Sequence, residues 1–165
     1  MLSLYVMRHS KSSWKNKHLE DYKRPLSKKG KSEIKLITKF LINKKTRLDL
    51  AYVSSAKRTV QTYKKLIKKI KIKDIIFSKK LYLTDTSIIL KFIKETKSRY
   101  KNLILINHEP SCKKLVLQLI KKKYIKFKEK IFDTSSIAKI DFEVDKWNKI
   151  KNYSGKLIFF KTPNN

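Results

Sequence analysis

The sequence predicts an α/β fold: a three-layer sandwich with a mostly parallel central sheet and helices on both faces of that sheet. Short apolar segments of strand length alternate with longer segments whose apolar residues recur at helical spacing. No repeat, low-complexity linker or Pro/Gly-rich hinge interrupts this alternation. Alternating strands and helices build parallel sheets covered by helices, and 165 residues can bury one sizeable core. We therefore expect a single domain over residues 1–165.

The first expected strand is the apolar, β-prone segment Leu2–Met7, which a polar loop follows. Ser27 is then expected to cap a helix that runs to about Ile42, because a serine side chain accepts a hydrogen bond from the free N–H groups at a helix start. We expect a second strand at Leu48–Val53 and a helix over residues 57–70. The residues expected to face the core from the second helix are Val60, Leu66, Ile67 and Ile70.

The second half of the chain continues the alternation. We expect one helix from Thr86 to about Thr96 and another from about Pro110 to Ile120, with the proline in the first turn, where its missing N–H costs little. The residues expected to face the core from the first of these helices are Ile88, Ile89, Phe92 and Ile93. The expected strands are Ile75–Phe77, Leu103–Ile106, Ile137–Phe142 and Lys156–Phe160.

Polar side chains follow three of the expected strands. Arg8 and His9 come directly after the first strand, Arg58 lies at the start of the helix after the second, and His108 follows the strand at Leu103–Ile106. Because the carboxyl ends of parallel strands open at the same edge of a sheet, we expect these side chains to converge. An arginine offers a planar fork of donors to phosphate oxygens, and a histidine offers a nitrogen nucleophile. The pattern therefore predicts a phosphate site.

Other kinds of site fail on spacing. The chain has only two glycines, Gly30 and Gly155, so no glycine-rich phosphate loop can form. His108-Glu109 lacks the second histidine of a zinc-protease helix, and His18 lies in a lysine-rich loop with no partner. The single cysteine, Cys112, rules out an internal disulfide and a cysteine-based metal knuckle. We expect no metal and no cofactor.

The formal charge of +30 comes almost entirely from lysine. The chain holds 38 lysines and five arginines, spread along its whole length. Proteins that recognise nucleic acid use arginine freely, whereas this chain uses little, so we expect no specific nucleic-acid partner. Two explanations of the high lysine content remain open. Either a biased genome composition places lysines on solvated faces, or the lysines are selected to bind an anionic partner. No apolar run approaches the roughly 20 residues that span a bilayer, and no basic segment precedes the first strand, so we expect a cytoplasmic protein without a membrane partner.

Several stretches, in order along nearly the whole chain, resemble the histidine phosphatase superfamily, also called the phosphoglycerate-mutase-like fold. They are MRHSKSSW, DYKRPLSKKG, SSAKRTVQT, NHEPS, FDTSSIAKIDFEVDKW and GKLIFFKTP. Within that superfamily the chain is most similar to the small SixA-type phosphohistidine phosphatases. The resemblance implies that His9 is the nucleophile that becomes phosphorylated, and that Arg8, Arg58 and His108 bind the phosphoryl group. Arg24 and Ser10, which stands where glycine is usual, are further candidates at the pocket.

The implied mechanism needs a neutral His9, whose other ring nitrogen a backbone carbonyl could hold protonated. Arg8, Arg58 and a protonated His108 would spread donors over the phosphoryl oxygens, and water would then hydrolyse the intermediate. Larger superfamily members add a carboxylic acid that protonates the leaving group. Asp85 is the candidate here, and its alternative role is an N-cap for the next helix.

The expected activity is hydrolysis of phosphohistidine in a protein, with a histidine phosphotransfer domain as one candidate partner. A missing acid favours that substrate, because imidazole needs little acid help to leave. A small chain without a lid also favours it, because an open pocket could admit a side chain that another protein presents. The alternative within enzymes is a small phosphomonoesterase that acts on a sugar phosphate or a similar metabolite. The alternative of another class is a non-catalytic binder of phosphorylated or polyanionic partners.

Overall fold

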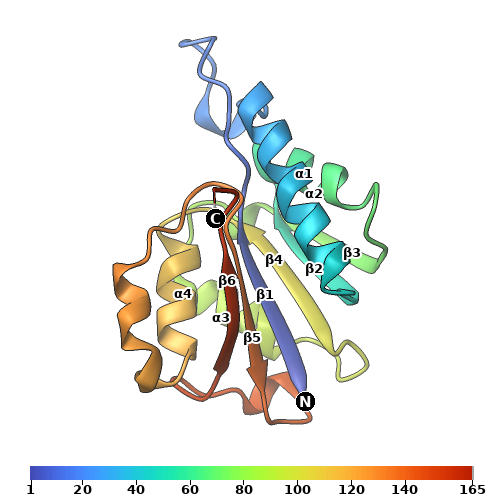
Figure 1. Ribbon diagram of the computed structural model, residues 1–165, viewed down its shortest axis with the longest axis vertical. Coiled ribbons are helices and arrows are strands. Elements are labelled where there is room, and N and C mark those ends of the chain that lie inside the picture. Colours follow the sequence, from blue (N-terminus) through green and yellow to red (C-terminus); the bar gives the residue numbers. More distant parts are fainter. Residues whose placement is uncertain (165) are drawn as a thin grey trace.

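The computed structural model describes residues 1–164 and contains one six-stranded sheet (Figure 1). Its strands are β1 (Leu2–Arg8), β2 (Leu48–Ser54), β3 (Ile72–Ser78), β4 (Asn102–Asn107), β5 (Ile137–Phe142) and β6 (Lys156–Lys161). They lie in the order β3-β2-β4-β1-β5-β6. β3, β2, β4 and β1 are parallel, and β5 is antiparallel to both of its neighbours. The predicted mostly parallel sheet is confirmed.

Helices cover both faces of the sheet. They are α1 (Lys28–Asn43), α2 (Lys57–Leu66), α3 (Thr86–Lys94) and α4 (Ser111–Leu119). α1 and α2 pack against one face through a buried cluster that includes Ile37 and Leu66, and α3 and α4 pack against the other through a cluster that includes Ile93 and Leu115. Successive strand side chains alternate between the two clusters, because side chains of a strand point to opposite faces. The three-layer sandwich is therefore confirmed.

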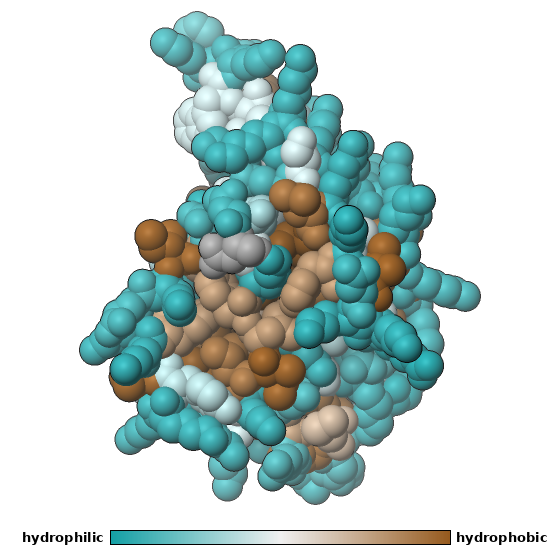
Figure 2. Space-filling view, viewed as in Figure 1, coloured by the Kyte–Doolittle hydropathy of each residue, from teal (hydrophilic) through white to brown (hydrophobic). Residues whose placement is uncertain are grey.

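The space-filling view shows hydrophilic side chains over most of one side of the molecule (Figure 2). An apolar area lies in the middle of that view, over β5 and β6 beside α1. In the part of the chain that the structure describes, no helix is long and apolar enough to cross a membrane.

Three elements differ from the predicted boundaries by more than one residue at an end. β3 is longer than the predicted Ile75–Phe77, because it is an edge strand whose charged Lys73 and Asp74 face solvent and hide the apolar pattern. α2 ends at Leu66, so Ile67 lies beyond the helix and is 40% exposed instead of facing the core. α3 ends at Lys94, and its Ile88 is 39% exposed, because one helical step turns it away from the stripe that Ile89 and Ile93 bury.

The start of α1 packs closely against the loop that follows β1. The Ser27 side chain caps the helix by accepting from Gly30 N at 3.0 Å, as predicted, and also donates to the Lys11 carbonyl at 3.0 Å. A Cβ at Gly30 would clash with the Lys11 backbone, so glycine is needed for this approach. The loop between β1 and α1 therefore starts from a fixed position at the carboxyl end of the sheet (Figure 1).

Candidate active site

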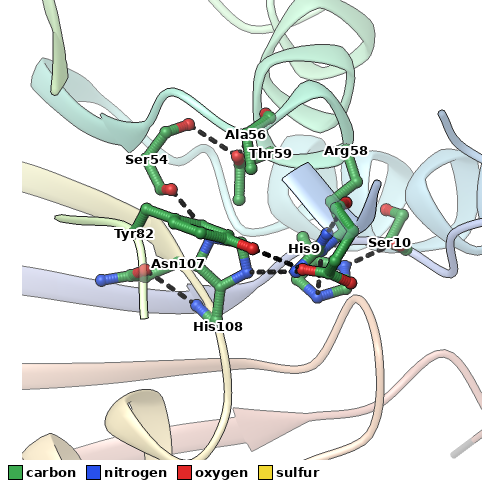
Figure 3. Close-up of polar contacts among 10 residues, drawn as sticks. His9, Ser10, Ser54, Ala56, Arg58, Thr59, Tyr82, Asn107 and His108 are labelled. Carbon is green, nitrogen blue, oxygen red and sulfur yellow. Dashed lines mark hydrogen bonds and ion pairs between the residues drawn. The ribbon is translucent and has the colours of Figure 1, made fainter. Parts of the chain in front are cut away.

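Three neighbouring strand ends bring four of the predicted site residues to one cavity. Arg8 ends β1 and His9 follows it, Arg58 lies in the first turn of α2 after β2, and His108 follows β4. These three strands are adjacent and parallel, so their carboxyl ends open at the same edge. A cavity of about 330 Å³ at this edge is lined by all four side chains. Figure 3 shows Arg58 and the two histidines pointing toward one another.

The buried guanidinium of Arg58 joins the two histidines. Its Nε donates to Nε2 of His9 at 3.2 Å, and its Nη2 lies 3.2 Å from Nδ1 of His108. Nη1 donates to the Asp21 carbonyl at 2.7 Å, and Nη2 donates to the Asp21 carboxylate at 2.9 Å. The cavity therefore contains a fixed arginine whose donors already point at both ring nitrogens.

His9 has the tautomer that a nitrogen nucleophile needs. Its Nδ1 donates to the Ser10 carbonyl at 2.8 Å, which leaves the lone pair on Nε2, the nitrogen that faces Arg58. Burial, together with the charges of Arg58 and Arg8, outweighs that hydrogen bond and lowers the pKa of His9 to about 4. His9 is therefore neutral near pH 7, and the predicted backbone carbonyl is in place.

His108 is also neutral in the protein without substrate. Its Nε2 lies 2.8 Å from Oγ of Ser54, while its Nδ1 accepts from Arg58. The pKa of His108 is lowered to about 3, mainly by burial. The neighbouring His9 and the charge of Arg58 lower it further. The ring of Tyr82 packs edge-on against His108 with the ring centroids 5.3 Å apart. In the protein without substrate, Arg58 therefore carries the positive charge of the Arg58–His108 contact, and the His108 ring is uncharged.

Arg8 lines the cavity from the end of β1. Its Nη1 donates to the Phe132 carbonyl at 2.9 Å, and its backbone N–H donates to the Ser136 carbonyl at 3.0 Å. The loop before β5 therefore holds both the backbone and the side chain of Arg8.

Asp21 is a site residue that the sequence did not single out. Its carboxylate pairs with Arg58 and accepts from the Tyr82 hydroxyl at 2.6 Å. Partial burial raises the pKa of Asp21, but the hydrogen bonds from Tyr82 and Arg58 outweigh it and lower the pKa below its ordinary value. An ionised carboxylate therefore lies in the cavity beside the arginine. The only signal in the sequence is its place in the stretch DYKRPL.

Arg24 does not line the cavity, which corrects its prediction as a pocket residue. It is buried, donates to the carbonyls of Asn16 and Lys17, and stacks against the ring of Trp14 at 3.8 Å. The nearby Asp21 pairs with Arg58 instead of Arg24. Arg24 therefore holds the loop after β1 in shape, because its fork of donors matches two successive carbonyls.

Ser10 also turns away from the cavity. It is fully buried, its N–H donates to Thr62 Oγ1 at 3.0 Å, and its hydroxyl accepts from Ser135 at 2.6 Å. Glu33 of α1 lies behind this contact and accepts from the Lys11 N–H at 3.1 Å and from Ser135 at 3.3 Å. Ser10 and Glu33 therefore support the turn that carries His9, and Glu33 is a second residue that the sequence did not single out.

Asp85 lies outside the cavity of the histidines. It is exposed and lines a separate cavity beside the starts of α3 and α4, and as the residue before α3 it makes no side-chain capping hydrogen bond. The carboxylates that do line the histidine cavity are Asp21 and Glu109. Burial raises the pKa of Glu109, although the Lys113 N–H and the charge of Arg8 oppose it. A carboxyl group with a raised pKa holds a proton more readily.

Comparisons with known proteins bear on the sequence and the fold. The sequence profile of the histidine phosphatase superfamily (branch 1) matches residues 4–82, which include Arg8, His9 and Arg58. A search of curated proteins found no match.

Solved structures extend the likeness to the whole chain. One is a protein named as a phosphohistidine phosphatase SixA from Nakamurella multipartitia, with a TM-score of 0.85 at 17% identity, covering 98% of this chain and 96% of the other. Another is a protein histidine phosphatase SixA complexed with tungstate, with a TM-score of 0.83 at 20% identity, covering 99% and 98%. A phosphoserine phosphatase from Entamoeba histolytica has a TM-score of 0.68 at 11% identity, covering 99% and 98%.

The fold and the cavity define the class of protein as a phosphatase. The sequence match over residues 4–82 and the fold shared over the whole chain make it similar to the histidine phosphatase superfamily.

Proposed function

We propose that this protein is a phosphohistidine phosphatase that works through a covalent phosphohistidine on His9. The observation that carries the proposal is the tautomer of His9. The Ser10 carbonyl holds the proton on Nδ1, so that the Nε2 lone pair faces a cavity lined by Arg8 and Arg58. A neutral imidazole fixed in this way can attack phosphorus without first losing a proton.

In the first step, Nε2 of His9 forms a bond to phosphorus while the bond from phosphorus to the substrate nitrogen breaks. For this step Arg58 exchanges its contact with His9 for the phosphoryl oxygens, to which Arg8 also donates. In the second step, water attacks phosphorus, inorganic phosphate leaves, and His9 regains its lone pair. A phosphoryl dianion beside His108 raises the pKa of that ring, so His108 can carry a proton in the complex although it is neutral without substrate.

The leaving group favours phosphohistidine. A departing imidazole that is protonated on its other nitrogen leaves as a neutral ring, so cleavage of the P–N bond needs no separate acid. An alkoxide leaving group needs a proton donor, because it departs as a strong base. The ionised Asp21 cannot supply that proton.

The entrance of the cavity fits a substrate carried by a protein. Trp14 and Leu83 line the cavity and are 62% and 59% exposed. The stack on Arg24 fixes Trp14, and Leu83 has a φ of 46°, an uncommon conformation for leucine. Exposed apolar side chains at an entrance suit contact with another protein. A phosphorylated partner such as a phosphotransfer domain, met in the cytoplasm, is therefore the proposed substrate.

A phosphomonoesterase is the second candidate, and Glu109 is the observation that favours it. Glu109 lines the cavity, and its raised pKa suits a carboxylic acid that protonates an alkoxide. Glu109→Gln separates the two candidates. It should slow the hydrolysis of a phosphate ester and leave the hydrolysis of a phosphohistidine peptide unchanged if ester cleavage uses this acid.

The direct test compares turnover of a phosphohistidine peptide and of phosphoserine by the wild-type protein, by His9→Ala and by the control Asp85→Asn. We expect faster turnover of the phosphohistidine peptide, loss of that turnover in His9→Ala, and wild-type rates in Asp85→Asn. Phosphate release by His9→Ala at the wild-type rate would rule out the covalent route. Faster turnover of phosphoserine would favour the phosphomonoesterase, and turnover of neither substrate would favour a non-catalytic binder.

A further inference from the structure

We propose that this protein has a second anion site, at the opposite end of the sheet from the histidines, which binds an oligophosphate. The site is a cleft of about 750 Å³ at the starts of β2, β3 and β4, which we call the basal cleft. Its lining comes from residues 42, 45–49, 69–71, 73, 99, 101 and 102. In Figure 1 these strands start at the end of the sheet where the N-terminus lies, away from the cavity of the histidines. The proposal does not depend on the proposed function.

The lining of the basal cleft is strongly basic. It contains seven lysines and arginines and one acidic residue, Asp49. Lys73 pairs with Asp49 at 3.2 Å, and within residues 1–164 the other six basic side chains of the lining form no ion pair. Six cations of like charge around one concavity repel one another, and a multiply charged anion removes that repulsion.

The arginines distinguish the basal cleft from the lysine-rich surface elsewhere. The chain uses lysine 38 times and arginine five times. Arg8, Arg24 and Arg58 belong to the histidine cavity or to the loop beside it, and the other two, Arg47 and Arg99, both line the basal cleft. A composition that favours lysine everywhere does not explain why the remaining arginines meet at one cleft. Arginine binds phosphate oxygens with two parallel hydrogen bonds, which lysine cannot do.

The basal cleft has a fixed framework. The Asp49 carboxylate accepts from the N–H groups of Lys101 and Asn102 at 2.9 and 2.8 Å, which ties the start of β2 to the segment before β4. Arg99 donates to the Tyr100 hydroxyl at 2.7 Å and stacks on its ring at 4.8 Å. The carboxylate in the lining is therefore satisfied by N–H groups and Lys73, and one of the two arginines is held in place.

The shape and the lining favour a small oligophosphate over a nucleic acid. The volume lies in the range of about 300–1,000 Å³ that is usual for small-molecule sites. No aromatic side chain is among the lining residues that the structure describes, so a single strand would find no platform on which its bases could stack. A chain of linked phosphoryl groups needs only cations and N–H donors, which this cleft supplies. Inorganic tripolyphosphate and a nucleoside triphosphate share that chemistry.

The test is calorimetric titration with tripolyphosphate and, in a separate arm, with ATP, at fixed ionic strength. The two compared variants carry Arg58→Gln, which weakens the competing phosphate site, and the Arg58→Gln parent and the wild-type protein are titrated beside them. The basal variant adds Arg47→Gln and Arg99→Gln, and the matched control instead adds Lys31→Gln and Lys68→Gln, two exposed lysines outside the basal cleft. We expect one tripolyphosphate per protein and a loss of roughly tenfold or more in affinity in the basal variant only.

Three outcomes would overturn part or all of the proposal. Equal weakening in the two variants would show that net charge alone attracts the anion. Binding absent from the Arg58→Gln background but present in the wild-type protein would assign it to the histidine cavity. A thymidine oligonucleotide that binds more tightly than tripolyphosphate and depends on Arg47 and Arg99 would make the ligand a nucleic acid. Tighter binding of ATP than of tripolyphosphate would identify the ligand as a nucleoside triphosphate instead of an inorganic oligophosphate. Thermal melting checks that both variants fold.

Discussion

The histidine cavity and the basal cleft are both cationic, and they lie at opposite ends of the same parallel strands. In the cavity, Arg58 is buried, and its guanidinium contacts both histidines and Asp21. In the basal cleft, Arg47 and Arg99 are exposed, and Arg47 has no ion-pair partner among the described residues. A buried and oriented donor can stabilise a transition state, whereas exposed cations mainly provide binding that salt screens. Substitutions should therefore affect chemistry at one end and only binding at the other.

The largest expected effect is that of His9→Ala. Without the Nε2 nucleophile no covalent intermediate can form, and turnover of a phosphohistidine peptide should fall by ~10³-fold or more. Rapid quenching with a radiolabelled substrate should show labelled protein for the wild type and none for the variant. Label retained in His9→Ala would place the nucleophile elsewhere and remove this difference between the two regions.

Arg58→Lys should cost about 10²-fold in kcat/KM, since an oriented donor at a developing charge is worth about that much. Lysine keeps the charge but has one nitrogen in place of the three that contact His9, His108 and Asp21. Steady-state kinetics check the value. Wild-type kcat in Arg58→Lys would show that charge alone is sufficient in the cavity, as it is on an exposed surface.

The next effect concerns stability and pH. The pKa values of His9 and His108, about 4 and about 3, lie below the ordinary value of 6.5, so below pH 6.5 the unfolded chain binds protons that the folded chain does not. The free energy of unfolding should therefore decrease as the pH falls from about 6.5 through about 4, by on the order of a few kcal/mol. Urea denaturation between pH 4 and 8 measures it. The decrease should be shallower in His9→Asn and unchanged when Arg47→Gln and Arg99→Gln are made in the otherwise wild-type protein; an unchanged decrease in His9→Asn would mean that other groups cause it.

The same contrast explains how much the sequence could predict. The strand-end rule placed Arg8, His9, Arg58 and His108 at one cavity, because the elements that carry them are defined by local apolar patterns. Asp21 and Glu33 reach the site from a loop and from a buried position of α1, and no local pattern predicts such an approach. The neutrality of His108 in the protein without substrate depends on burial, which the sequence does not show. The basal cleft was missed because its cations come from three separate connections.

A smaller effect is expected for Asp21→Asn. The ionised carboxylate lies beside Arg58 and opposes the entry of a phosphoryl anion, whereas asparagine keeps an oxygen that can accept from Nη2. We expect inorganic phosphate to inhibit the variant several-fold more strongly than the wild type, by simple charge repulsion at short range. The inhibition constant measures this. Weaker inhibition would show that the carboxylate acts mainly by positioning Arg58. The position of Arg58, and not the charge of Asp21, would then determine how strongly the cavity binds phosphate.

The smallest expected effect on catalysis is that of Arg47→Gln and Arg99→Gln made together in the otherwise wild-type protein. β2 and β4 run from the basal cleft to Ser54 and Asn107 beside His108, and both strands are buried in the middle of the sheet. Exposed side chains at their far ends can change without moving such strands, so kcat/KM for the phosphohistidine peptide should stay within about twofold of the wild-type value. Kinetics at low and high salt measure it. A larger loss of kcat/KM that appears only when tripolyphosphate is present would mean that the strands couple the basal cleft to the histidine cavity. The two regions would then form one linked system instead of two independent sites.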